Sequence, residues 1–135
     1  MTMTPTQTVD AVYATLGRGE PQGILALLDP AVVWQGPPSV AWGGVHHGPA
    51  GARKFLETFG SLFELADLSR ERTIAQDDMV VTCGTLKGKG RITGKAATSD
   101  YAWFWQVKNG KITRFQGYID SATLAAATTP EPVRA

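Results

Sequence analysis

The 135-residue chain is poor in several features that commonly indicate function. It holds one cysteine, Cys83, which excludes an internal disulfide and a zinc site built from clustered cysteines. Its formal net charge is +1, so no excess of one sign predicts binding to nucleic acid or to an anionic membrane surface. No apolar run reaches the length of a membrane span, and the first ten residues lack the pattern of a secretory signal. We therefore expect a soluble, cytoplasmic protein that binds neither nucleic acid nor membranes.

The composition is that of a folded domain. Apolar residues make up 43% of the chain and charged residues 19%, values typical of a protein with a hydrophobic core. The length suits one core and is too short for two ordinary domains. We expect a single domain over residues 1–135, with an ordered core of about 6–127 and a frayed C-terminal tail.

Helical patterns dominate the first half of the chain. Apolar residues recur at helical spacing in three segments, residues 6–17, 21–28 and 49–63. "AVVW", residues 31–34, is typical of a short strand. The segment 36–48, "GPPSVAWGGVHHG", is too rich in glycine and proline to predict regular structure. Because it contains Trp42, we expect this loop to cover an apolar interior.

The second half of the chain has the two-residue period of strands. Candidate strands are residues 65–76, 79–92, 97–108 and 111–119, followed by a short helix at 121–127. Asn109-Gly110 can take positive φ at both central positions of a turn and predicts a β-hairpin. Helices followed by hairpin-linked strands predict an α+β fold with the helices on one face of a curved antiparallel sheet.

The strand "YAWFWQVK" is apolar on both faces. Tyr101, Trp103 and Trp105 share one face, whereas Ala102 and Phe104 lie on the other. We expect the first face to meet the helices and any cavity that they enclose. The second face is then left for a second copy of the chain, so we expect a homodimer through the outer face of the sheet.

Three stretches carry a family resemblance: "ILALLDPAVVW", "WGGVHHGPAGARKF" and "VKNGKITRFQGYIDSATL". With the order of elements, they resemble the SnoaL-like and ketosteroid-isomerase-like families, in the superfamily named after nuclear transport factor two. The resemblance runs from about residue 9 to residue 127. It implies a cone-shaped, cystatin-like α+β barrel with an apolar cavity between the sheet and the helices. It does not imply one activity, because members include isomerases, cyclases, hydrolases and non-catalytic binders.

The catalytic residues of these families do not carry over to this chain. The isomerase base matches Gln35 or Gly36, the oxyanion-hole tyrosine matches Val12, and its acid partner matches Trp103. The catalytic acid of the epoxide hydrolases matches Gly117. The usual ketosteroid isomerase trio is therefore missing.

The resemblance also implies a set of cavity residues. Matching the last two strands to those of the isomerases turns alternate residues toward the cavity. Trp34 and Trp42 are then expected at the mouth of this cavity. The predicted substrate-binding residues are Trp34, Trp42, His46, Trp103, Trp105, Phe115 and Ile119. The alternative is that these rings simply fill the core and leave no cavity.

Three residues are candidates for acid–base chemistry. His47 is placed at the cavity mouth, where an imidazole can act as acid or base without a cofactor, and the alternative is a solvated loop residue beside a helix start. Tyr101 can donate a hydrogen bond to a carbonyl or enolate, or its hydroxyl can lie in water at the sheet edge. Asp120 is the nearest match to the cyclase acid, but it also suits capping of the last helix. Adjacent histidines with no spaced third ligand do not predict a metal site.

The basic stretch "LKGKGRITGK" does not fit a phosphate-binding loop, because its glycine spacing is one residue short and Ala96 follows its last lysine. Lys87, Lys89 and Arg91 instead alternate onto one strand face, which predicts a solvated face. Cys83 lies in mid-strand and is expected to be an inert buried thiol.

These observations favour a protein with a pocket for a small hydrophobic molecule. As an enzyme it would be cofactor-independent, doing acid–base chemistry on a carbonyl-bearing or polyketide-like substrate. The alternatives are a non-catalytic binder with the same pocket, and a dimeric scaffold whose cavity is filled. A ligand-sized void with a titratable side chain in reach indicates the enzyme, and a void without one indicates the binder.

Overall fold

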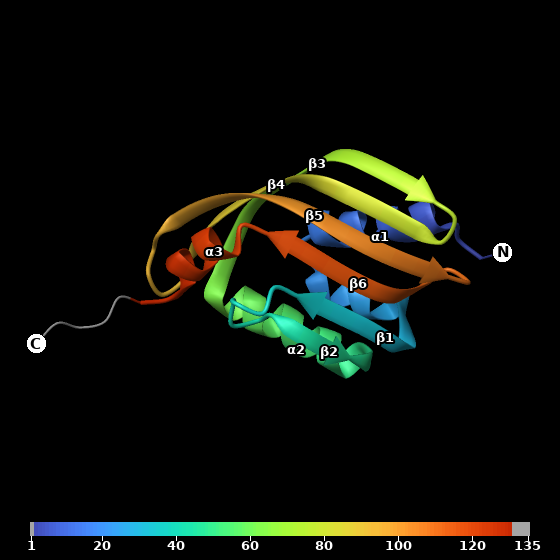
Figure 1. Ribbon diagram of the computed structural model, residues 1–135, viewed down its shortest axis with the longest axis horizontal. Coiled ribbons are helices and arrows are strands. Elements are labelled where there is room, and N and C mark those ends of the chain that lie inside the picture. The colour runs from blue at the N-terminus through green and yellow to red at the C-terminus, as the bar shows by residue number, and fades with distance from the viewer. Residues whose placement is uncertain (1, 131–135) are drawn as a thin grey trace, which may run out of the picture.

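Helices and two strands fill the first half of the chain, and four consecutive strands with a last helix fill the second (Figure 1). The computed structural model describes residues 2–130, so residues 131–135 of the expected frayed tail lie outside the described part. The first half holds α1 (Pro5–Gly17), the 3-10 helix η1 (Pro21–Leu27), β1 (Leu28–Gly36), β2 (Gly44–His47) and α2 (Gly48–Leu62). The second half holds β3 (Phe63–Gln76), β4 (Met79–Gly90), β5 (Ala96–Lys108), β6 (Lys111–Ile119) and α3 (Ser121–Thr128).

Local signals explain where the helices begin. Thr4 and Gln7 form a capping box, in which the Thr4 hydroxyl accepts from the Gln7 N–H and the Gln7 side chain accepts from the Thr4 N–H. Proline stands in the first turn of each of α1, η1 and α2, where its missing N–H costs nothing. The second expected helix is a 3-10 helix of seven residues, longer than most runs of this tighter winding.

The sheet has six strands in the order β2-β1-β6-β5-β4-β3. The predicted α+β fold is confirmed, with a mixed sheet, since β1 pairs with β6 in parallel and the other pairs are antiparallel. One expectation is wrong: part of the segment 36–48 forms β2, which pairs with residues 33–36 of β1. Backbone hydrogen bonds make this pairing, so the glycines and histidines of the segment do not prevent it.

The expected hairpin turn between β5 and β6 is confirmed. Asn109 has a φ of 52° and Gly110 a φ of 73°, as a tight turn with two left-handed residues requires. The register shift between Gln106 and Val107 leaves Thr113 of β6 without a partner on β5, so Ile112 is buried like Phe115 although the two lie three residues apart.

The sheet curves over the helices and encloses the core on one side. Figure 1 shows α1 and α2 lying against the concave face of the sheet, and α3 at one end beside the turn between β4 and β5. The Thr93 hydroxyl in that turn donates to the Ala127 carbonyl of α3. Among residues 2–130, no helix has the length and apolar character needed to cross a membrane.

Candidate functional site

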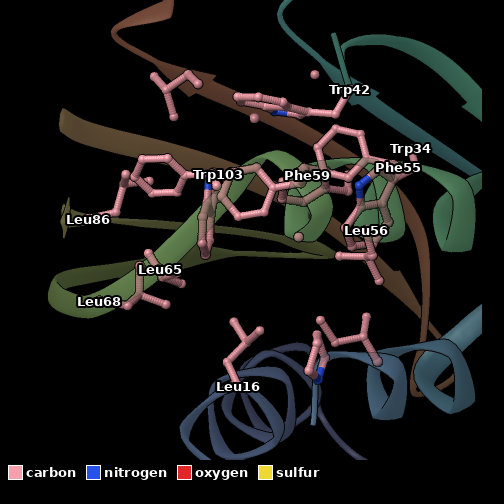
Figure 2. Close-up of a pocket in the computed structure, with 18 of the residues that line it drawn as sticks. Leu16, Trp34, Trp42, Phe55, Leu56, Phe59, Leu65, Leu68, Leu86 and Trp103 are labelled. Atoms are coloured by element: carbon pink, nitrogen blue, oxygen red, sulfur yellow. The ribbon is translucent and has the colours of Figure 1, made fainter. Parts of the chain in front are cut away.

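An apolar cavity of about 380 Å³ lies between the concave face of the sheet and the helices. Val12 and Leu16 of α1 line one side, and α2 contributes Phe55, Leu56 and Phe59. Figure 2 shows Leu16 across the space from the rings of Phe59 and Trp103. The volume lies within the usual range of small-molecule sites. The side chains therefore leave room for a ligand instead of filling the cone.

Strand parity builds the sheet side of this cavity. Trp103 and Trp105 of β5 and Phe115 of β6 point inward, as the two-residue period predicts. The Phe115 ring stacks on Trp34 of β1 with 4.2 Å between centroids and lies 4.7 Å from the Trp105 ring. Gly117 is paired with Trp103 across the strands, and a Cβ there would lie 3.0 Å from the Phe115 ring. The missing side chain therefore leaves room for the Phe115 ring beside the strand.

Six of the seven predicted substrate-binding residues line the cavity. They are Trp34, Trp42, Trp103, Trp105, Phe115 and Ile119. Trp42 covers the apolar interior as expected, with 2% of its surface exposed and its ring edge-on to Phe59 at 4.9 Å. The seventh residue, His46, is not among the lining residues. Its Nε2 donates to the carbonyls of Trp42 and Gly43 at 3.1 and 3.0 Å, so it holds the loop that carries Trp42.

None of the three predicted catalytic side chains is among the lining residues. His47 is exposed at the N-terminal end of α2, on the outward-facing parity of the edge strand β2. Asp120 caps α3, accepting from the Thr123 N–H at 3.1 Å and from the Thr123 hydroxyl at 2.7 Å. These bonds lower the pKa of the Asp120 carboxyl. Of its two expected roles, the structure gives it helix capping.

Tyr101 points inward, but protein groups engage its hydroxyl. It donates to the Ser69 carbonyl of β3 at 2.8 Å and lies 2.8 Å from the Tyr13 hydroxyl of α1. Since the Tyr101 proton goes to Ser69, Tyr13 is the donor to Tyr101. Burial raises the pKa of both phenols, and that of Tyr101 rises strongly. Neither expected role of Tyr101, free donor or solvated edge residue, matches this arrangement.

The wall of the cavity carries little polarity. Among its lining residues Arg91 is the only one with a charged side chain, and none carries a carboxylate, an imidazole, a thiol or a phenol. Trp105 Nε1 donates to the buried Thr82 hydroxyl at 3.0 Å. Trp34 Nε1 is buried without a hydrogen-bond partner among the described residues. No group in the wall is therefore suited to take a proton from a bound molecule.

Sequence analysis missed the role of Arg91. Lys87 and Lys89 are exposed on β4 as expected, but β4 ends at Gly90, and Arg91 turns toward the cavity from the following turn. The expectation that Arg91 shares a solvated face with Lys87 and Lys89 assumed a strand that includes residue 91, but β4 and its alternation end at Gly90. Cys83 is only half-buried in β4. Residues 2–130 contain no group of three or more histidine, cysteine or acidic side chains able to hold a metal ion.

Comparison with known proteins identifies similar structures. Residues 9–115 match the family model of the SnoaL-like domain. An NTF2-like protein from Burkholderia thailandensis is 26% identical, with a TM-score of 0.86 over 95% of this chain and 99% of that one. TerC, co-crystallized with polyporic acid, is 28% identical, with a TM-score of 0.77 over 92% of this chain and 97% of its own. Comparison with the curated proteins gives no match.

A more distant structure shares the fold alone. It is a protein with a ketosteroid isomerase-like fold from Catenulispora acidiphila in complex with trimethylamine, 16% identical, with a TM-score of 0.77 over 93% of this chain and 94% of that one. Two of these three similar structures were thus obtained with a small molecule. The fold expected from the sequence is confirmed by all of them.

Proposed function

This chain belongs to the SnoaL-like domain family, and from that premise we propose that it is a binding protein for a small, flat, apolar molecule. The observation that carries the proposal is the 380 Å³ cavity whose aromatic wall offers no side chain able to act as a general base. Stacked and edge-on rings such as Trp34 and Phe115 favour planar, ring-bearing ligands. Polyporic acid, found with the similar TerC, is a suitable first probe.

An acid–base enzyme is the alternative from the sequence, and no observation in the cavity favours it. His47 is exposed, Asp120 caps a helix and the Tyr101 hydroxyl is bonded to Ser69 and Tyr13. A general base must come within hydrogen-bond reach of the proton that it removes. We therefore expect His47→Ala and Asp120→Asn to leave ligand binding unchanged within a factor of about two.

The test of binding uses a variant that blocks the cavity. Leu56 of α2 is half-buried and lines the cavity, so Leu56→Trp should fill part of the space and weaken the binding of polyporic acid at least about tenfold, or about 1.4 kcal/mol. Val45→Trp is the matched control, because Val45 is 53% exposed on β2 and does not line the cavity. Isothermal titration calorimetry and quenching of tryptophan fluorescence give the affinities. Equal binding by both variants would contradict the proposal.

We also propose that two copies associate through the outer face of the sheet. Phe104 of β5 and Tyr118 of β6 are 37% and 49% exposed on that face, and their rings meet edge-on at 5.7 Å. Two neighbouring exposed aromatic residues on a sheet face are typical of an association surface. The cavity lies on the other side of the sheet, between the sheet and the helices, so a dimer of this kind does not cover it.

A further inference from the structure

The cavity has one polar feature that a purely apolar ligand would not use. Arg91 is exposed, lines the cavity, and carries the only formal charge among the lining residues. None of the described residues that line the cavity has an acidic side chain to neutralise it. The cavity therefore combines an aromatic slot with a single positive charge.

Two hydrogen bonds hold Arg91 at this position. Its backbone N–H donates to the Leu62 carbonyl at 2.9 Å, and its Nε donates to the Gly60 carbonyl at 2.6 Å. Both carbonyls belong to the last turn of α2, whose Phe59 and Leu56 face the same cavity. The guanidinium group is therefore held at the cavity wall at low entropic cost, because its Nε and backbone N–H are bonded to α2 before any ligand arrives.

The terminal nitrogens of Arg91 remain available. Within residues 2–130, the three ion pairs join Arg18 to Glu20, Arg70 to Asp10 and Lys89 to Glu64. Arg91 takes part in none of them, and its Nη1 and Nη2 make no hydrogen bond to a described residue. Four N–H donors of a planar fork thus have no partner among residues 2–130, an arrangement that suits two parallel bonds to a carboxylate.

A simpler explanation of Arg91 is that it only caps the C-terminal end of α2. Basic side chains often bond the last carbonyls of a helix. That role uses the backbone N–H and Nε and explains why the residue is anchored. It does not require the residue to line a cavity, and it leaves the terminal nitrogens unused. The two explanations differ in one measurable respect, the preference for a charged ligand.

The indole groups of the wall do not replace Arg91 as the polar anchor. Trp34 Nε1 has almost no accessible surface, so a ligand does not reach it without moving the surrounding rings. The indole N–H groups of Trp42 and Trp103 make no hydrogen bond to residues 2–130, but as neutral donors they serve an amide as well as a carboxylate. Only Arg91 distinguishes the two by charge.

From this arrangement we infer that the ligand is an aromatic acid, with its rings in the tryptophan-lined slot and its carboxylate on Nη1 and Nη2 of Arg91. The inference rests on the proposed binding function and names the chemical class of its ligand. A charge-assisted, bidentate pair is about twice as strong as a neutral hydrogen bond. Its position at the rim keeps both charges partly hydrated, which limits the cost of desolvation.

The experiment compares 2-naphthoate with its neutral analogue 2-naphthamide, which have the same rings. We expect the unmodified protein to bind the naphthoate at least about tenfold more tightly than the amide at neutral pH, a preference that shrinks as salt is added. Arg91→Gln should remove this preference and leave the affinity for the amide unchanged. Arg91→Lys should restore part of it, since it keeps the charge and loses the fork.

Lys89→Gln is the matched control. Lys89 lies two residues earlier, is exposed and paired with Glu64, and does not line the cavity, so its loss should change neither affinity. A loss of thermal stability in Arg91→Gln with the preference for naphthoate retained would overturn the inference and leave only the capping role. Equal affinities for both probes in the unmodified protein would overturn it while the binding function stands. Failure of both probes to bind, while polyporic acid binds, would overturn the inference alone, and failure of all three would refute the binding function as well.

Discussion

At the scale of single residues, Tyr101 shows how a hydroxyl suited to chemistry is used for stability. Its bond to Ser69 ties β5 to β3, and its contact with Tyr13 ties the sheet to α1. Arg70 lies 4.3 Å from the centroid of the Tyr13 ring and pairs with Asp10 at 2.7 Å. The Tyr101 hydroxyl is therefore part of a network that joins the first helix to the sheet.

Tyr101→Phe removes the hydroxyl and leaves the Ser69 carbonyl and the Tyr13 hydroxyl without this partner. We expect the free energy of unfolding to fall by about 1–2 kcal/mol in urea titrations at neutral pH. Burial raises the pKa of Tyr101 above its unfolded value of 10.0. The contribution of its neutral hydroxyl to the free energy of unfolding is therefore fully present below pH 10 and is lost as the pH rises further.

The alkaline loss of stability should therefore be smaller in Tyr101→Phe than in the unmodified protein. Tyr118→Phe is the control for this comparison, since its ring is 49% exposed on the outer face of the sheet. If both variants lost stability above pH 10 to the same extent, the buried pair of phenols would not be its source.

At the scale of elements, turns and strand ends decide which residues reach the site. β4 stops at Gly90, and the turn that follows carries Arg91 to the cavity and Thr93 to α3. The loop before β2 carries Trp42 over the interior, held in part by His46. Arg91 and Trp42 both lie in turns outside the strands, so the two-residue period of a strand does not predict where their side chains lie.

Two glycine substitutions are predicted to have opposite effects, one in the turn between β5 and β6 and one at the end of α1. Gly110 has a φ of 73°, and a Cβ there would meet the Thr2 side chain at 2.8 Å, so Gly110→Ala should lower the free energy of unfolding by about 1–2 kcal/mol. Gly17 is the last residue of α1 and has no atom within 4 Å of a built Cβ. Gly17→Ala should therefore raise the free energy of unfolding by up to about 1 kcal/mol.

Chemical denaturation of the two variants under one set of conditions measures both effects. A stabilised Gly110→Ala would mean that the turn does not hold its left-handed conformation in solution.

At the scale of the whole molecule, the sheet separates two apolar surfaces with different uses. The concave face meets the helices around the cavity, and the opposite face presents Phe104 and Tyr118. Association on the outer face would thus build a dimer without closing either cavity. Ligand binding and dimerisation are predicted to be separable by mutation.

Phe104→Lys tests the outer face, because it replaces an exposed ring with a charge that meets its own copy across a two-fold interface. We expect the dimer to dissociate roughly thirtyfold more readily, about 2 kcal/mol, while the affinity for polyporic acid is unchanged. Size-exclusion chromatography with light scattering measures the change. Val45→Lys, at a 53% exposed position on β2, is the control and should remain dimeric. A monomeric unmodified protein would refute the proposed interface.

The sequence by itself determined the order of the elements except β2, the hairpin turn and, together with the family resemblance, the inward face of β5 and β6. These features depend on short-range patterns, the two-residue period around Trp103 and Trp105 and the left-handed preference of Asn109-Gly110. Only the tertiary structure decided the parallel pairing of β1 with β6, the contact of Tyr13 with Tyr101 and the place of Arg91. Each of these joins segments far apart in the chain through backbone hydrogen bonds or packing, which no local pattern records.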